Sequence, residues 1–243
     1  MKNIDFLEKN LIAHRGMHDI NRGIPENSIE AFKRAINNNF IIELDLHILK
    51  DKNVVVFHDD DLNRMTGKDK KIADCTYEEI KNLKLQNTDN YIPLFNEVLK
   101  VIDGKVPIII ELKYDTKCGI LEKATMELLA NYKGLYAIKS FNPFSVNWLR
   151  KNYPNVIRGQ LSSDFRNQKM NIIKKLFLKS MIFNVISMPD FISYDIRAMP
   201  NKKIEKERRT KKILGWTVSD TKTMLEKKKY CDNLICEKLD ELC

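Results

Sequence analysis

Glycine and proline are scarce in this chain, with 8 and 7 residues respectively among 243. This scarcity excludes a collagen-like protein and the Pro- and Gly-rich compositions of low-complexity chains. Hydrophobic residues make up 43% and charged residues 31% of the sequence, which is enough apolar material for a core and excludes a disordered chain. The length is usual for an α/β barrel, so we expect a single domain over residues 1–243.

Long apolar runs are also missing. No stretch approaches the ~20 residues that a membrane-spanning helix needs. The segment Met1–Lys9 carries Asp5 and Glu8 where a signal peptide would have its apolar region. The sequence therefore predicts no transmembrane segment, no export signal and a cytoplasmic location.

Cysteine is present but not in a pattern that forms disulfides or binds zinc. The five cysteines are scattered, odd in number and lack CxxC spacing: Cys75, Cys118, Cys231, Cys236 and Cys243. A zinc site needs a tighter cluster of cysteine and histidine. We therefore expect reduced thiols that serve mostly in packing.

Positive charge exceeds negative charge, with a formal net charge of +9. The excess is concentrated in the last third of the chain, most densely from Lys202 to Lys212. Such a run can contact nucleic acid or an anionic membrane. It is not accompanied by the interleaved aromatic residues that stack on bases. We interpret it as a solvated helical face and expect no nucleic-acid partner.

Short β-rich runs alternate with amphipathic segments along the chain, which is the pattern of βα units and a parallel sheet. Between Ser28 and Asn38 the apolar residues recur on one helical face, and Asn27 or Ser28 is suited to cap that helix. The predicted strands are 10–14, 41–48, 54–58, 107–113, 135–141, 156–161, 181–187, 213–218 and 233–237.

The nine predicted strands exceed the eight of a closed α/β barrel by one. Too few residues separate strands 41–48 and 54–58 for a parallel crossover, which needs about 10–12 residues, so these two must form an antiparallel hairpin. Eight parallel strands then remain. The sequence predicts a single TIM-type (β/α)8 barrel with an added β-hairpin. An open doubly wound sheet is the alternative, but no Gly-rich phosphate loop follows the first strand.

Polar residues cluster where the predicted strands end. His14-Arg15-Gly16 closes the first strand, His58-Asp59 closes the hairpin, and Glu111-Leu112-Lys113 closes the strand that begins at Ile108. In a TIM barrel the carboxyl ends of the strands form the active-site face. The positions of these residues therefore indicate catalysis.

Residue parity brings the acidic residues together. Glu43, Asp45 and His47 share one face of strand 41–48, and Glu111 shares its face with Lys113. If the hairpin is centred between Asp51 and Lys52, Asp45 pairs with His58, although a slip of one residue would turn His58 away.

Three carboxylates at a barrel mouth make an oxygen-rich site for one hard divalent cation, Mg²⁺ or Ca²⁺. His14 and His58 could move protons at neutral pH, while the cation and Arg15 neutralise a phosphate. This set is suited to cleaving a phosphodiester. His18 and His47 are weaker candidates, and Trp216, near a strand end, could stack against a substrate.

An ordered set of motifs makes the chain resemble the glycerophosphodiester phosphodiesterase family from about residue 10 to 237. The motifs are His14-Arg15-Gly16, Pro25-Glu26-Asn27-Ser28, Glu43-Leu44-Asp45, His58-Asp59, Thr66-Gly67, Glu111-Leu112-Lys113, Ser140-Phe141 and Gly215-Trp216-Thr217-Val218. The resemblance implies a metal-dependent TIM-barrel hydrolase that cuts a small-molecule glycerophosphodiester into an alcohol and glycerol 3-phosphate. In the family mechanism, a glycerol hydroxyl of the substrate attacks phosphorus, and water then hydrolyses a cyclic phosphate.

The resemblance also implies a role for each site residue. Glu43, Asp45 and Glu111 would be the metal ligands, His14 and His58 the general acid and base, and Arg15 and Lys113 the phosphate-binding groups. Three features depart from the family pattern, one of which is Ser219 in place of the usual Asn after Trp216-Thr217-Val218. The segment between His58 and Glu111 is shorter than is common, and the usual Thr-Asp-x-Pro ending is replaced around Cys236-Glu237-Lys238.

Two other functions compete with this interpretation. A phospholipase D-like or lysophospholipid-cleaving enzyme would use the same barrel and ligands but would need an apolar groove or membrane-facing loops. A non-catalytic protein that binds an anionic polymer through the basic run would not need His14 and His58 beside a metal site.

Overall fold

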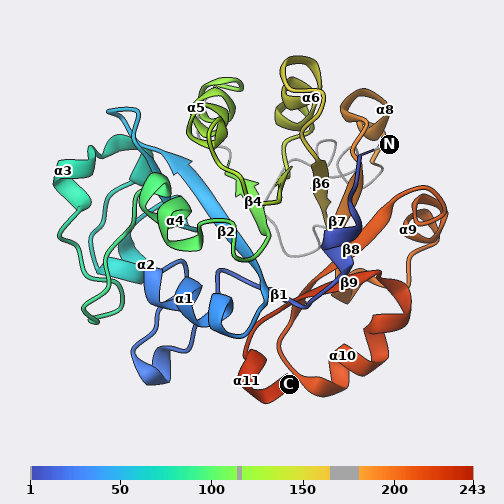
Figure 1. The fold of residues 1–243 in the computed structure, drawn as a ribbon, viewed down its shortest axis with the longest axis horizontal. Coiled ribbons are helices and arrows are strands. Elements are labelled where there is room, and N and C mark those ends of the chain that lie inside the picture. Colours follow the sequence, from blue (N-terminus) through green and yellow to red (C-terminus); the bar gives the residue numbers. More distant parts are fainter. Residues whose placement is uncertain (1, 114–116, 165–180, 243) are drawn as a thin grey trace.

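A closed barrel of parallel strands forms the centre of the molecule (Figure 1). The computed structural model describes residues 2–113, 117–164 and 181–242. Its strands are β1 (Ile12–Ala13), β2 (Ile41–Ile48), β3 (Val54–Val56), β4 (Ile108–Leu112), β5 (Tyr136–Ser140), β6 (Arg158–Ser162), β7 (Phe191–Asp195), β8 (Lys212–Val218) and β9 (Asn233–Cys236).

The order of the strands confirms the predicted barrel. Neighbouring strands run β1-β9-β8-β7-β6-β5-β4-β2-β3, and a further pairing of β1 with β2 closes the sheet on itself. Ile12 is in register with both Ile41 and Ile235, so the short first strand bridges the two sides of the closure. All these pairings are parallel except that of β3, which runs antiparallel to the far end of β2 as the added hairpin.

The predicted register of the hairpin is wrong by one residue. Leu46 pairs with Val56 and Ile48 with Val54, so Asp45 lies opposite Phe57 rather than His58. The Phe57 N–H donates to the Asp45 carbonyl over 3.0 Å. The cause is the turn, in which the Leu49 N–H donates to the carbonyl of Asn53 and Lys52 takes the left-handed conformation. The turn is therefore centred on Asp51, and not between Asp51 and Lys52 as predicted.

The strand predicted at 181–187 is also wrong. Residues 184–187 form the short helix α8 (Asn184–Ser187), and the strand at this position in the barrel is β7, at Phe191–Asp195. The apolar run at 181–187 resembles a buried strand in sequence, but Val185 is 79% exposed, and the ring of Phe183 lies 5.6 Å from that of Phe144 on the outside of the barrel. Tertiary packing has overridden local propensity here.

Helices surround the barrel, with α1 to α4 on one side, α5, α6 and α8 along another, and α9 to α11 near the C-terminus (Figure 1). The remaining helices are α1 (Ile29–Asn37), α2 (Asn63–Thr66), α3 (Tyr77–Ile80), α4 (Phe95–Ile102), α5 (Ile120–Leu129), α6 (Pro143–Asn152), α9 (Lys202–Glu207), α10 (Thr221–Lys227) and α11 (Leu239–Leu242), with 3-10 turns η1 (Asp5–Glu8), η2 (Ile20–Arg22), η3 (Ile72–Asp74), η4 (Ile196–Ala198) and η5 (Lys228–Tyr230).

Apolar side chains fill the amino end of the barrel. Phe6 and Leu7 of η1 pack there with inward residues of the strands, including Phe191 and Leu214. A larger cluster lies between the strands and the helices, and a separate cluster is formed by apolar residues between positions 49 and 92, beside the hairpin. The polar residues of the barrel interior are thus left to its carboxyl end.

The basic run begins with α9 and continues into the turn that follows. Lys202 and Lys203 are exposed, while Ile204 faces the core. Arg208 pairs with Asp232 at 3.0 Å and Lys211 with Glu207 at 2.6 Å. Part of the positive charge of this run is therefore neutralised within the chain.

Four of the cysteines are free thiols in the structure: Cys75, Cys118, Cys231 and Cys236. Cys243 lies outside the described residues. In the parts of the chain that the structure describes, no helix has the length and apolar character needed to cross a membrane.

Gly159 tests the packing of the barrel interior, because its Cα–H faces the ring of Phe191 on the adjacent strand. A methyl group at residue 159 would overlap this ring, so we expect Gly159→Ala to lower the free energy of unfolding by about 1–3 kcal/mol. Urea denaturation measures the change. Combining it with Phe191→Leu should cost less than the sum of the two single changes, since the smaller side chain makes room. Strict additivity would contradict the contact.

Candidate functional site

Three carboxylates converge at the carboxyl end of the barrel, on two adjacent strands. Glu43 and Asp45 lie two residues apart on β2, and Glu111 on β4 is in register with Asp45. The three residues are 0%, 1% and 5% exposed, and a carboxylate oxygen from each lies within 4.8 Å of the others. The structure therefore brings together the acidic residues that strand parity predicted.

Two lysine ammonium groups lie among these carboxylates. Lys113 Nζ is 2.9 Å from Asp45 Oδ1 and 2.7 Å from Glu111 Oε1. Lys139 Nζ, from β5, is 2.8 Å from Glu43 Oε1 and 3.6 Å from Glu111 Oε2. Sequence reasoning missed Lys139. Its signal was a lone lysine within the apolar strand at 136–140, on the strand that follows the one carrying Glu111.

The lysines favour the ionised forms of Asp45 and Glu111 in spite of their burial. Burial alone would raise the pKa of Asp45, but Lys113, His58 and Arg15 together hold it well below its usual range. Burial also opposes the ionisation of Glu111, and Lys113 and Lys139 outweigh it and lower the pKa. The carboxylates in turn raise the lysine pKa values against the effect of burial. All four groups are therefore charged at neutral pH.

The loop before α1 supports Asp45 from a second direction. Asn27 donates from Nδ2 to Asp45 Oδ2 over 2.9 Å, and Asn27 itself holds a positive φ of 56°. Ser28 is the helix cap, since its hydroxyl accepts the N–H of Ala31. Of the two predicted cap residues, Ser28 caps the helix and Asn27 contacts the acidic site.

The turn after β1 brings its backbone against α1 and the acidic strand. Arg15 donates from its backbone N–H to Glu43 Oε2 over 3.1 Å, and its Nε lies 3.5 Å from Asp45 Oδ2. Gly16 follows with φ 79°, and a Cβ there would come within 2.9 Å of the Ala31 side chain. A glycine is needed at this position for both reasons.

His14 is oriented by the residue that follows the last strand. Its Nδ1 lies 2.8 Å from Oε1 of Glu237. The hydrogen bond with His14 outweighs burial and lowers the pKa of Glu237 to about 2. The pairing of β1 with β9 brings these residues together, although they are far apart in the chain. Glu237 occupies the C-terminal segment that departs from the family motif, and its contact could not be read from local sequence.

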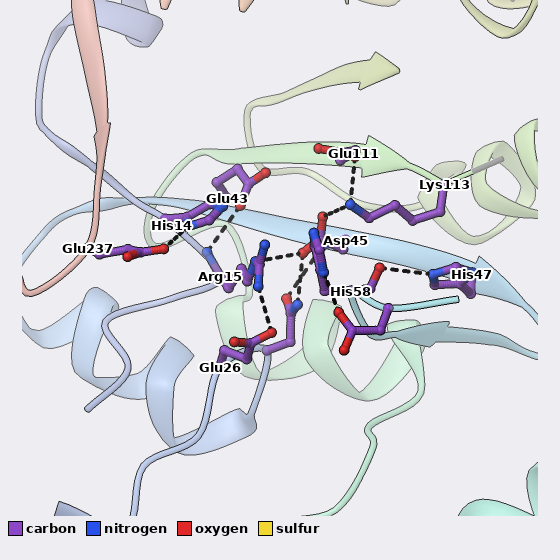
Figure 2. Close-up of polar contacts among 12 residues, drawn as sticks. His14, Arg15, Glu26, Glu43, Asp45, His47, His58, Glu111, Lys113 and Glu237 are labelled. Atoms are coloured by element: carbon purple, nitrogen blue, oxygen red, sulfur yellow. Dashed lines mark hydrogen bonds and ion pairs between the residues drawn. The ribbon is translucent and has the colours of Figure 1, made fainter. Parts of the chain in front are cut away.

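His58 belongs to a network of alternating charge. Its Nδ1 lies 2.6 Å from Asp59 Oδ1, and Arg64 Nε donates to Asp59 Oδ2 over 2.6 Å. Arg64 also donates to Glu26, which accepts from Arg15 as well. The network thus connects His58, through Asp59, Arg64 and Glu26, to Arg15 beside the acidic site. Figure 2 shows the two imidazoles approaching the carboxylates from different directions.

The two weaker histidine candidates and Trp216 occupy different environments. His47 is fully buried, and its Nε2 lies 3.3 Å from the carbonyl of His58, so it supports the backbone there. His18 is near His14 and Arg15, and burial lowers its pKa. Trp216 lies at the end of β8, edge-on to Phe141 with 5.8 Å between ring centroids. Its buried Nε1 has no hydrogen-bond partner among the described residues.

The donor set at Glu43, Asp45 and Glu111 fits a hard divalent cation. Three buried carboxylates converge from adjacent strands, and Mg²⁺ and Ca²⁺ take oxygen ligands of this kind. Glu26, His58 and Asp59 form a second group with similar spacing. Arg64 already pairs with both carboxylates of that group, so a guanidinium compensates its charge.

Comparison with known sequences connects this geometry to one family. A model of the Glycerophosphoryl diester phosphodiesterase family matches residues 14–237. YhdW of Bacillus subtilis is 34% identical over 156 residues, which are 60% of this chain and 63% of that protein. A glycerophosphodiester phosphodiesterase of Caldanaerobacter subterraneus is 35% identical over 162 residues, 62% of this chain and 65% of that protein. The chain thus spans slightly less than two thirds of these relatives. Human lysophospholipase D GDPD1 is 35% identical over 140 residues, 52% of this chain and 42% of that protein.

Solved structures share the barrel. A phosphodiesterase from Oleispira antarctica, solved with its product sn-glycerol-3-phosphate, has a TM-score of 0.79 at 20% identity and covers 97% of this chain and 96% of its own. A glycerophosphodiester phosphodiesterase from Thermotoga maritima has a TM-score of 0.71 at 25% identity, with 96% and 95% covered. These structures agree with the barrel fold of this chain.

The contact between Glu237 and His14 predicts a pH-dependent contribution to stability. Because the pKa of Glu237 falls from 4.5 to about 2 on folding, the contact stabilises the protein above pH 4.5, and this stability is lost as the pH falls toward 2. Glu237→Gln should therefore be less stable than the parent at pH 6, and the difference should shrink by pH 3. Urea unfolding followed by circular dichroism measures it. Glu241→Gln, at an exposed glutamate of α11, is the control, and a difference for Glu237→Gln that does not change with pH would contradict the contact.

Proposed function

The chain belongs to the glycerophosphoryl diester phosphodiesterase family, and on that premise we propose that it hydrolyses glycerophosphodiesters to an alcohol and glycerol 3-phosphate with one divalent cation bound. The observation that carries this proposal is the cluster of three buried carboxylates with a histidine–carboxylate pair on each of two neighbouring segments. Neither a binding protein nor a structural protein needs both features at one barrel mouth.

Glu43, Asp45 and Glu111 would hold the cation, either Mg²⁺ or Ca²⁺. Bound there, a divalent cation neutralises the phosphate and stabilises the charge that develops as the ester bond breaks. Arg15 and Lys113 would bind the phosphate oxygens. Their side chains are 15% and 13% exposed, so each reaches solvent while it borders the buried carboxylates. An anion that enters from the barrel mouth would meet these two cations.

His14 and His58 would move the protons. Each imidazole has its Nδ1 engaged with a carboxylate, Glu237 or Asp59, which assigns proton transfer to Nε2. One Nε2 would take the proton from the attacking glycerol hydroxyl as its oxygen bonds to phosphorus. The other would give a proton to the departing alcohol oxygen as its bond to phosphorus breaks. Water then opens the cyclic phosphate with the two roles reversed.

A lysophospholipid is the competing substrate class. The sequence identity between this chain and human lysophospholipase D GDPD1 favours this substrate class over other phosphodiesters. The same phosphodiester bond would be cleaved in both classes. The substrates would differ in the acyl chain that a lysophospholipid carries on its glycerol, and in the alcohol that is released. Trp216, at the end of β8, would contact the glycerol or the headgroup in either case.

The ligand role of Asp45 predicts the result of a conservative substitution. Asp45→Asn keeps the shape of the side chain but removes one of the three charges, so we expect hydrolysis to fall by more than about 10²-fold, because even supporting residues of metal sites are worth 10–100-fold. The measurement is the rate of glycerol 3-phosphate release, with circular dichroism as the check on folding. Asp69→Asn, at an exposed aspartate, is the matched control. Parental rates in Asp45→Asn would refute the ligand role.

The histidine roles predict how two alanine variants behave. His14→Ala and His58→Ala should each lower kcat by about 10²–10⁴-fold, with less effect on KM, because the phosphate still meets Arg15 and Lys113. The losses should combine less than additively, since both groups serve one reaction. A diester with a very acidic leaving group should restore the rate of only one variant, and that histidine is the acid. A double variant with kcat within a few-fold of the parent would overturn the assignment.

A further inference from the structure

Arg64 holds two carboxylates beside the site at the same time. Its Nε donates to Asp59 Oδ2 over 2.6 Å, and its Nη1 donates to Glu26 Oε2 over 3.0 Å. Its Nη2 donates to both carboxylates, to Asp59 Oδ1 over 3.0 Å and to Glu26 Oε1 over 2.6 Å. All three guanidinium nitrogens are therefore engaged, in a forked geometry that a lysine ammonium cannot reproduce.

The short helix that carries Arg64 is anchored by apolar packing. α2 has four residues, and Met65 is 2% exposed while the preceding Leu62 is fully buried. Both belong to the cluster beside the hairpin, which also contains Phe57, the neighbour of His58. The backbone of Arg64 and that of His58 are thus held by one packed unit, although the Arg64 side chain is 45% exposed.

Each carboxylate that Arg64 holds has a second partner among the residues proposed to carry the reaction. Asp59 Oδ1 lies 2.6 Å from Nδ1 of His58. Glu26 Oε1 accepts from Nη1 of Arg15 over 2.7 Å. Burial alone would raise the pKa of both carboxyl groups, but the hydrogen bonds and positive charge of their partners lower it. Arg64 is therefore the group through which the two pairs are connected.

The two carboxylates are close enough to repel each other. A carboxylate oxygen of Glu26 lies within 4.8 Å of one of Asp59. Without the guanidinium between them, Asp59 would turn away from Glu26 and would take with it the acceptor that orients His58. The charge of Glu26 would then act mainly on Arg15, which would leave that guanidinium less available to a phosphate.

Building on the proposed function, we propose that Arg64 is a positioning residue for the reaction. Through Asp59 it fixes the orientation of His58, and through Glu26 it keeps Arg15 available to the phosphate. Because one guanidinium serves both pairs, its loss should impair proton transfer and anion binding together.

Two measurements test the two effects separately. The kcat on a glycerophosphodiester that the parent hydrolyses reports on His58, and the calorimetric Kd for sn-glycerol 3-phosphate, at one fixed concentration of the divalent cation, reports on Arg15. In Arg64→Leu we expect kcat to fall by about 10–100-fold, the usual loss when a residue that orients a site group is removed. The Kd should rise about tenfold or more, comparable to the loss of one hydrogen bond to a charged group.

Asp59→Asn is the one-sided comparison. It disturbs the partner of His58 while Arg64 still holds Glu26, so kcat should fall but the Kd should stay within about twofold of the parent. Arg209→Leu, at an exposed arginine before the amino end of β8, is the matched control and should change neither value. Circular dichroism and Tm show that each variant is folded at the assay temperature.

Arg64→Lys separates the forked geometry from the charge. An ammonium keeps the positive charge but cannot hold both carboxylates, so kcat and Kd should both remain close to those of Arg64→Leu. This variant also keeps the inquiry decisive if Arg64→Leu does not fold, because the same two changes are expected in it.

Parental kcat and Kd in the Arg64 variants overturn the proposal, even if Tm falls, because Arg64 would then serve stability alone. A change confined to one of the two values, or full recovery of both in Arg64→Lys, overturns it as well. If the parent releases no glycerol 3-phosphate from any glycerophosphodiester, the proposed function fails with this inference. If the parent is active and the Arg64 variants match it, only the role of Arg64 fails.

Discussion

The burial of three carboxylates beside two lysines is the constraint on which the rest of the site depends. Glu43, Asp45 and Glu111 are at most 5% exposed, so each must find charged or hydrogen-bonding partners within the protein. A buried ion pair adds little net stability, but removing one partner costs about 3–5 kcal/mol. The carboxylate cluster is therefore better explained by a functional role than by a contribution to the folding stability of the protein. Its arrangement requires parallel strands in register, which the barrel provides at the carboxyl ends of β2, β4 and β5.

The two histidines are held beside this cluster by different parts of the chain. Glu237 follows β9 and contacts His14 after β1, so closure of the barrel completes one histidine–carboxylate pair. Asp59 contacts His58 directly after the hairpin, and Arg64 of α2 connects that pair to Glu26 (Figure 2). The hairpin and the segment beside it thus supply His58, the second of the two proposed proton-transfer groups, which a barrel of eight parallel strands alone would lack.

Residue patterns predicted the parts of the structure that depend on local periodicity. The bounds of β2 at 41–48 and the shared face of Glu43 and Asp45 follow from strand alternation and are confirmed. The failures involve one local turn and contacts between distant segments. The apolar run at 181–187 has strand propensity but packs outside the barrel, and the hairpin register depended on the conformation of Lys52. Lys139 and Glu237 gain their partners only through strand pairing across the barrel, which local sequence does not encode.

The most direct test of the central claim is hydrolysis by chelator-stripped protein, with Mg²⁺ or Ca²⁺ added back in steps. Glycerophosphodiesters are scored by release of glycerol 3-phosphate, and lysophospholipids by release of lysophosphatidic acid. The account predicts no release without an ion, and release from at least one glycerophosphodiester that saturates when one ion is bound per chain. Undiminished hydrolysis after exhaustive chelation, or no glycerol 3-phosphate from any glycerophosphodiester with either ion, would contradict it.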